Sequence, residues 1–256
     1  LAPFLYWDSD PYLVVRADGT LSWIIDGYTT SDRHPYTESV RTKEAGVVNY
    51  ARNAVKATVD AYTGETHLYV FEPGDPLIRA YRNIFPALFL DNAAMPADLR
   101  EHARYPEWLF HIQAEVLLTY HMTEADAFYN KVDVWDIARH STSEVRGKAP
   151  LDPNYVVAAL PKEAGGTGEP EFLLMLPFTP KGKDNLIGLL IARCDGASLG
   201  QMALLELPKE ELFYGPMQME SRLNQDQNIS KDLTLWNQQG SQVLHGQMVV
   251  LPVGET

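Results

Sequence analysis

The residues best suited to ligand chemistry lie between positions 218 and 239, where planar polar side chains accompany one indole. Amides, carboxylates, a guanidinium and an aromatic ring bind sugars or peptides, because they combine directional hydrogen bonds with a flat apolar face. The alternative is a pair of ordinary helices with polar outer faces. The composition predicts a ligand-binding surface made by Gln218, Glu220, Arg222, Asn224, Asp226, Trp236 and Asn237.

A serine nucleophile is suggested by Gly196–Gly200, which matches the Gly-x-Ser-x-Gly elbow, with His245 downstream. That elbow requires a parallel strand, a sharp turn and a helix. Here the preceding half of the chain is largely helical, and the following run, Gln201–Leu207, has the composition of another strand. The pattern therefore favours a hairpin turn, in which Ser198 is dispensable.

Two short groups could ligate a metal. Asp8 and Asp10 resemble the start of a calcium loop, but the later ligand positions of that loop are absent. His111 and Glu115 stand four residues apart on an expected helix, without the third ligand that a zinc site needs. We expect no metal and no cofactor.

The elements that would position these residues begin with strands. Tyr12–Arg16 and Thr20–Asp26 flank a turn signal and predict one hairpin, and Ala57–Tyr62 with Thr66–Phe71 predicts a second. Ala45–Lys56, between the two hairpins, is expected to be a short helix.

Helices are expected in the middle of the chain and strands after it. The helical ranges are Asp75–Phe85, Met95–Ala103, Pro106–Tyr120 and Thr123–Asn130, the last with Thr123 and Asp126 as a cap. Short apolar strands are expected at Tyr155–Leu160, Glu171–Leu176, Asn185–Arg193 and Gln201–Leu207. Two helices near 216–239 and a strand at Gln242–Val253 complete the pattern.

Composition limits the partners. The chain has 256 residues, 45% of them hydrophobic, which is enough for a substantial core. Its net charge of −13 repels phosphate backbones, so we expect no nucleic-acid partner. The single cysteine, Cys194, excludes an intramolecular disulfide and is expected to be a small buried side chain.

Several segments resemble an uncharacterised family (UPF type) of large bacterial multi-pass membrane proteins. The resemblance covers nearly the whole chain. It is clearest at Glu171–Leu176, Pro177–Pro180, Asp184–Arg193, Tyr214–Gln218 and Leu233–Asn237. It implies that this chain is part of a longer protein with membrane helices, that the present region lies outside the cytoplasm, and that no activity is assigned.

The sequence thus predicts an α+β fold, a mostly antiparallel sheet with a helical middle segment, in two lobes. Residues 1–140 would form hairpins and a helical lobe, and residues 150–256 an antiparallel sheet lobe with helices near 216–239. The favoured role is binding of an envelope polysaccharide, peptide or protein partner. The alternative is a hydrolase that cleaves an envelope polymer with paired carboxylates such as Glu220 and Asp226.

Overall fold

The chain forms two compact units. The computed structural model describes residues 1–142, 147–162, 165–238, 240–243, 246 and 248–251. The first unit comprises residues 1–116 together with 193–201, and the second comprises residues 117–192 and 202–256. The predicted lobes at 1–140 and 150–256 stay a prediction; the first unit ends at residue 116 and adds the tip of a later hairpin. The architecture is α+β with mostly antiparallel sheets and helices in the middle of the chain, as predicted.

One twisted sheet organises the first unit. Its strand order is β1-β3-β6-β7-β8, with β2 paired to β3, and only the β7–β8 pair is parallel. The strands are β1 (Tyr6–Trp7), β2 (Tyr12–Val15), β3 (Leu21–Ser31), β6 (Tyr50–Asp60), β7 (Thr66–Val70) and β8 (Phe89–Asp91). A separate hairpin joins β4 (Val40–Thr42) to β5 (Gly46–Val48). Both predicted hairpins are confirmed, since β2 pairs with β3 and β6 with β7.

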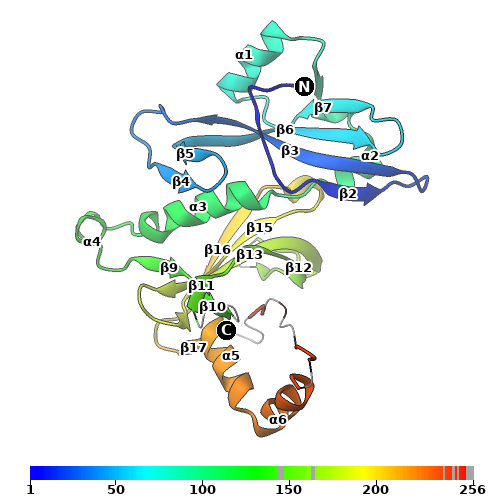
Figure 1. Ribbon diagram of the computed structural model, residues 1–256. Helices are drawn as coiled ribbons and strands as arrows, with labels where there is room; N and C mark the ends of the chain where they lie inside the picture. Colours follow the sequence, from blue (N-terminus) through cyan, green and yellow to red (C-terminus); the bar gives the residue numbers. More distant parts are fainter. Residues whose placement is uncertain (143–146, 163–164, 239, 244–245, 247, 252–256) are drawn as a thin grey trace. The chain divides into compact units, whose positions relative to one another are not determined.

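Both faces of this sheet are covered. Leu68 and Val70 of β7 belong to an apolar cluster with Ile78 of helix α1 (Pro76–Ile84). Tyr69, between them in sequence, belongs instead to a cluster with Leu99 of helix α2 (Ala97–Glu101). Successive residues of a strand point to opposite faces, so α1 and α2 cover opposite sides of the sheet. Figure 1 shows the two helices apart on this sheet.

Lys56 lies on the α2 face. It is directly opposite Tyr69 on one side and Asp26 on the other, and cross-strand partners share a face. The predicted helix at Ala45–Lys56 is therefore wrong, because these residues form β5 and most of β6. The backbone pairs of β6 with β3 and β7, together with its buried Val55, outweigh the helical preference of the alanines in this stretch.

Two helices and the tip of a hairpin complete the first unit. A 3-10 helix, η1 (Asn92–Ala94), precedes α2, and helix α3 (Glu107–Tyr120) begins in this unit. Residues 193–201 form a hairpin tip that contains a 3-10 turn, η3 (Gly196–Ser198). Gly200 has φ +85° and lies against the ring of Tyr105, where a Cβ atom would be 3.6 Å from that ring. A side chain at this position would be strained by its backbone angle.

A second antiparallel sheet organises the second unit, with order β12-β13-β15-β16 and β9 paired to β13. Its strands are β9 (Trp135–Ile137), β12 (Asn154–Ala159), β13 (Pro170–Pro180), β15 (Gly188–Arg193) and β16 (Met202–Glu206). Leu173 and Met175 of β13 pack with Leu189 and Ile191 of β15 in its core. Two small ladders join β10 (Arg139–Thr142) to β11 (Gly147–Pro150), and β14 (Asn185–Leu186) to β17 (Phe213–Tyr214).

The described residues of this unit include the helices α4 (Ala125–Asn130), α5 (Pro216–Gln225) and α6 (Gln227–Trp236). The N-cap of α4 is Glu124 without a side-chain hydrogen bond, so the predicted cap by Thr123 and Asp126 is wrong. The helices near 216–239 are confirmed. The described residues of 242–253 are not in a strand, which contradicts the expected strand there. No helix in the described ranges is long and apolar enough to span a bilayer.

Candidate functional site

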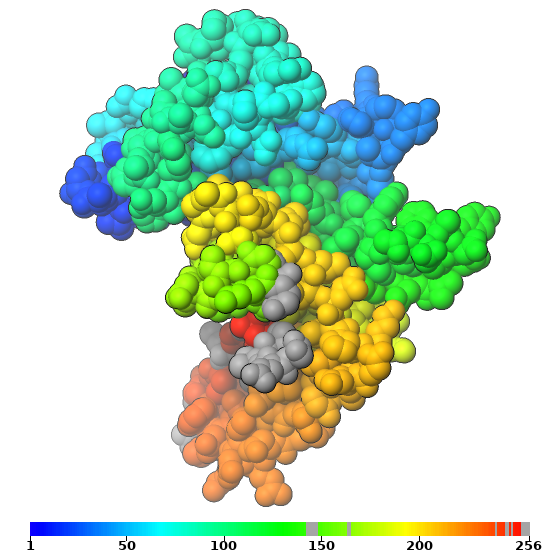
Figure 2. All heavy atoms as spheres, turned by 180° about the vertical axis from the view of Figure 1, so that it is seen from behind, coloured from blue at the N-terminus to red at the C-terminus, as the bar shows by residue number. Residues whose placement is uncertain are grey.

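The predicted ligand-binding residues lie on α5, α6 and the junction between them. Gln218, Glu220, Arg222 and Asn224 belong to α5, Asp226 separates the two helices, and Trp236 ends α6. No residue of α6 is buried, and Trp236 is 57% exposed. Figure 2 shows α5 and α6, in orange, with their outer surface open to solvent on the face drawn.

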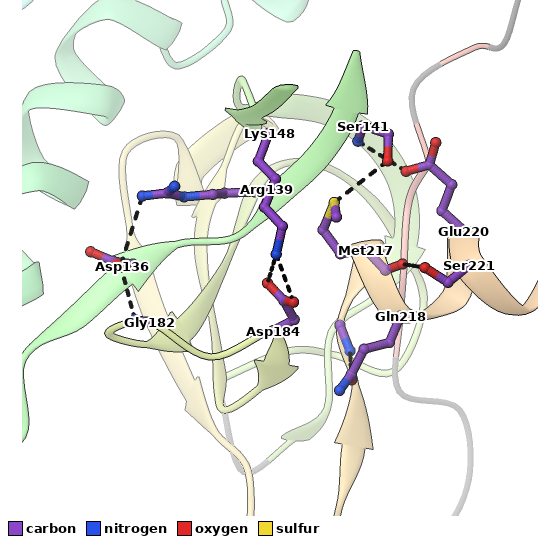
Figure 3. Close-up of polar contacts among 11 residues, drawn as sticks. Asp136, Arg139, Ser141, Lys148, Gly182, Asp184, Met217, Gln218, Glu220 and Ser221 are labelled. Carbon is purple, nitrogen blue, oxygen red and sulfur yellow. Dashed lines mark hydrogen bonds and ion pairs between the residues drawn. The ribbon is translucent and has the colours of Figure 1, made fainter. Parts of the chain in front are cut away.

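Most of these polar side chains hold neighbouring elements together. Glu220 accepts a hydrogen bond from the backbone N–H of Ser141 on β10, at 3.0 Å, as Figure 3 shows. Gln218 accepts one from the N–H of Gly215 at the start of its own helix. Asp226 accepts from the N–H groups of Asn228 and Ile229 and so caps α6.

The remaining predicted residues divide between contacts and exposure. The guanidinium of Arg222 lies 4.3 Å from the centre of the Tyr214 ring, which is a cation–π geometry. Asn237 accepts a hydrogen bond from the N–H of Val243. Asn224 is exposed and has no side-chain hydrogen bond within the described residues. The structure thus gathers the seven residues on one helical hairpin, and their role in ligand binding stays a prediction.

A hollow of about 620 Å³ lies in the first unit, on the α2 face of its sheet. This volume is within the range of small-molecule sites. Its lining combines buried residues with exposed charged side chains. The lining includes Arg52, Asn53, Lys56, Phe71, Glu72, Arg100, Glu101, Arg104, Tyr105, Leu109, Gln113, Leu199 and Gly200. We call this hollow the sheet cavity.

A buried ion pair forms part of the lining. Lys56 is 1% exposed and Asp26 is 4% exposed. The Lys56 ammonium donates to Asp26 Oδ1 and to the backbone oxygen of Arg104, the latter at 2.8 Å. It also lies 5.5 Å from the centre of the Phe71 ring. Several partners thus replace the water that this ammonium loses on burial.

Two amide side chains complete the polar part of the cavity. Asn53 Nδ2 donates to Asp26 Oδ1 at 3.0 Å. Gln113 Oε1 accepts from the Tyr105 hydroxyl at 2.7 Å. In the described part of the chain, Asn53 Oδ1 and Gln113 Nε2 have no hydrogen-bond partner. These two amides therefore present one open acceptor and one open donor to the cavity.

Burial shapes the titration of nearby groups. It raises the pKa of the Tyr12 hydroxyl, and the negative charge of Asp26 raises it further. Burial also raises the pKa of the Cys194 thiol to about 11. Cys194 is 2% exposed, which confirms the predicted buried side chain, and a thiol with this pKa is almost entirely protonated at neutral pH.

The serine motif forms a turn. Gly196–Ser198 is a 3-10 turn between β15 and β16, which are antiparallel neighbours. This confirms the predicted hairpin and excludes the strand-to-helix elbow at Ser198. His245 lies outside the described residues.

The candidate metal ligands have protein partners. Asp8 accepts a hydrogen bond from the Tyr28 hydroxyl, and Asp10 accepts one from the Arg104 guanidinium at 2.7 Å. His111 Nε2 lies 3.6 Å from Glu115 Oε1. Within the described ranges, no group of three or more His, Cys, Asp or Glu side chains is placed to hold a metal ion.

Sequence reasoning missed the sheet cavity. Asn53 and Lys56 lie in the range predicted to be a helix. Their contacts with Asp26 on the neighbouring strand therefore could not be predicted. One signal was present: Lys56 sits between Val55 and Ala57 in an apolar stretch, opposite an equally isolated Asp26 in the run Leu21–Tyr28. Isolated charges in two paired apolar strands are typical of a buried ion pair.

The comparison with protein families matches residues 1–236 to the uncharacterised protein family UPF0182. The chain belongs to this family. It is 64% identical to a UPF0182 protein of Solibacter usitatus over 256 residues, which is all of this chain and 28% of that protein. Relatives from Methanospirillum hungatei and Geobacter sulfurreducens are 50% and 48% identical, again over the whole chain.

The chain spans 27 to 28% of the length of these UPF0182 relatives, so it corresponds to one region of a larger protein. No solved structure matches it. The family assignment agrees with the resemblance seen in the sequence, and it brings no assigned activity.

Proposed function

We propose that this UPF0182 region is a binding module that lies outside the cytoplasm and is attached to the membrane helices of a longer protein. It recognises an envelope component through the sheet cavity. The proposal for the membrane helices is supported by the share of the relatives that this chain covers, since about three quarters of their length lies elsewhere.

The observation that carries the binding role is the sheet cavity with its two open amide atoms. Small-molecule sites are concave, largely apolar, and contain a few fixed polar groups. Leu109 is buried, and Phe71, Tyr105 and Leu199 are half-buried, while Asn53 and Gln113 provide the polar groups. Because Asn53 is anchored to Asp26, its open oxygen is held in place before any ligand arrives.

The hairpin of α5 and α6 is proposed as a second contact surface. Its open groups are the exposed Trp236 indole and the Asn224 amide. Such a surface suits the shallow rim of a complex, where individual contacts contribute little energy.

A second candidate function is hydrolysis of an envelope polymer. The observation in its favour is that two carboxylates, Glu72 and Glu101, line the same cavity. Glycoside hydrolysis uses a pair of carboxyl groups on either side of the bond that breaks. Glu220 and Asp226 are weaker candidates, since Glu220 accepts a backbone hydrogen bond from Ser141 and Asp226 caps α6.

The binding role is tested with fractionated envelope material. Wild-type chain and the variants Gln113→Leu, Gln242→Leu and Glu72→Gln/Glu101→Gln are incubated with each fraction. Retained and released molecules are identified by mass spectrometry. Retention of one envelope component that is lost in Gln113→Leu but kept in Gln242→Leu supports the cavity as the site. Cleavage products that disappear in the double glutamine variant support the hydrolase instead.

The location is tested in cells that make the full-length protein. Lys231 lies on the exposed helix α6, so Lys231→Cys gives an accessible thiol, and the full-length protein without this substitution is the background control. A membrane-impermeant maleimide should label Lys231→Cys in intact cells. Labelling only after lysis would place the region inside the cell and remove envelope components as ligands.

A further inference from the structure

The charges around the sheet cavity are balanced. The four cationic side chains of its lining are matched by four carboxylates, two of which line the cavity and two of which pair with lining cations. The cations are Arg52, Lys56, Arg100 and Arg104, and the anions are Glu72, Glu101, Asp26 and Asp10. A charged ligand would therefore find no excess of opposite charge around the cavity. A neutral ligand meets no electrostatic repulsion there.

Arg100 and Arg104 are also occupied by contacts within the fold, whereas Arg52 is exposed. Arg100 donates to the backbone oxygens of Asn92, Ala93 and Met95, at 2.8 to 2.9 Å. Arg104 donates to Asp10 and lies 4.2 Å from the centre of the Tyr12 ring. These contacts fix the two guanidinium groups within the fold, so neither offers the free bidentate face that recognises a phosphate or a carboxylate.

Two amides of the lining present open groups of opposite kind. Asp26 is an acceptor, so the Asn53 amide must turn its Nδ2 toward it, which leaves Oδ1 as the open atom. The Tyr105 hydroxyl likewise occupies Gln113 Oε1 and leaves Nε2 as a donor. Asn53 is only 9% exposed, so its open oxygen belongs to a side chain that is held in place in the lining.

A hydroxyl group matches both requirements, because a single O–H donates and accepts at once. A peptide group separates its donor from its acceptor across the C–N bond and needs an extended groove on both sides of it. The aromatic side chains of Phe71 and Tyr105 in the same lining suit the apolar face of a sugar ring.

We infer that the sheet cavity binds a neutral saccharide, with its hydroxyl groups donating to Asn53 Oδ1 and accepting from Gln113 Nε2. This inference rests on the proposed function, of which it specifies the ligand class. Tyr105 positions Gln113 for this contact through the hydrogen bond between their side chains.

The test uses the 256-residue chain with defined probes: cellobiose, maltose and N,N′-diacetylchitobiose as neutral saccharides, glucuronic acid as an acidic sugar, and N-acetyl-trialanine amide as a neutral peptide. Saturation-transfer NMR and calorimetric titration measure binding. At least one neutral saccharide should bind. Gln113→Leu and Gln113→Glu should each weaken that binding about tenfold, because both variants lose the Nε2 donor.

Gln242→Leu is the matched control, since it makes the same chemical change at an exposed position after α6, and it should leave the affinity unchanged. Thermal melts followed by circular dichroism verify that each variant is folded. Gln113→Glu keeps an acceptor for Tyr105, so it remains informative if Gln113→Leu does not fold.

Three outcomes would overturn the inference. Binding of the peptide or of glucuronic acid in place of the neutral saccharides, still sensitive to Gln113, would make the ligand class wrong and leave the proposed cavity in place. Saccharide binding that is insensitive to both Gln113 variants would move the site elsewhere. Absence of binding by all probes would reject the saccharide, while retention of envelope fractions decides the proposed function independently.

Discussion

The sheet cavity and the hairpin of α5 and α6 are both rich in polar side chains, and they differ in what surrounds those side chains. In the cavity, Asp26 and Lys56 are almost fully buried in the middle of a sheet. On the hairpin, Glu220 and Asp226 stand at the surface and hydrogen-bond to nearby backbone. Composition alone does not separate the two cases, because burial and concavity arise only from packing.

The two regions should differ most in the free energy of unfolding that is lost when one carboxylate is removed from each. Asp26→Ala leaves the Lys56 ammonium buried without a counter-charge, and we expect the free energy of unfolding to fall by about 3–5 kcal/mol. Glu220→Ala removes one surface hydrogen bond and should change it by less than about 0.5 kcal/mol. Urea denaturation followed by circular dichroism measures both. Equal losses would mean that the two regions contribute alike to stability.

A second contrast uses two aspartates that cap helices. Asp75 caps α1, is 4% exposed, and also accepts from Thr29 Oγ1 at 2.8 Å and from the Tyr50 hydroxyl. Asp75→Ala should cost about 3 kcal/mol, because it removes a cap and leaves buried donors without an acceptor.

Asp226→Ala should cost about 1 kcal/mol, and only within α6. Hydrogen exchange should accelerate at Asn228 and Ile229 while the melting temperature stays constant. A global loss of stability in Asp226→Ala would show that α6 is integrated into the core.

A smaller effect concerns pH. Burial and the hydrogen bond to Asp75 raise the pKa of Tyr50 from 10.0 to about 12. The fold therefore favours the protonated phenol, so this stabilisation is complete below pH 10 and is lost as pH rises toward 12.

Stability measured across that window should fall less steeply in Tyr50→Phe than in the wild type. If Tyr50→Phe keeps the wild-type slope, the Asp75 cluster does not carry the dependence.

The smallest expected effect is that of Ser198→Ala. Ser198 lies in the 3-10 turn between β15 and β16, where its hydroxyl has no catalytic setting. We expect a change in unfolding free energy below about 0.5 kcal/mol and no change in any hydrolytic activity. Stoichiometric labelling of Ser198 by a fluorophosphonate would contradict this.

Local patterns predicted those elements whose neighbours in sequence are also their neighbours in space. The hairpin around Asp18 and helix α1 are examples, since a turn signal or a cap with a first-turn proline is contained in a few residues. The helix predicted at Ala45–Lys56 was wrong. Alanines favour a helix, but the backbone pairs with β3 and β7 stabilise a strand here. The pairing with β3 joins Lys56 to Asp26, about thirty positions earlier in the chain, and no local window includes it.

The candidate site follows the same rule. The segment at 218–239 could be found from the sequence because its polar residues are contiguous. The sheet cavity draws Asn53, Tyr105 and Gln113 from a strand, a loop and a helix, and their convergence depends on the tertiary fold.

The position of Lys56 opposite Asp26 also has a consequence for folding. With β6 in place, a shift of one residue between β3 and β6 would turn Asp26 to the face that packs against α1, among Val55, Leu68 and Ile78, and would separate it from Lys56. The buried pair therefore acts as a register marker that penalises misaligned sheets. The double variant Asp26→Leu/Lys56→Met should keep most of the stability yet populate alternative strand alignments, which would broaden the backbone amide resonances of β3 and β6. Sharp, single resonances would show that the apolar pattern alone fixes the alignment.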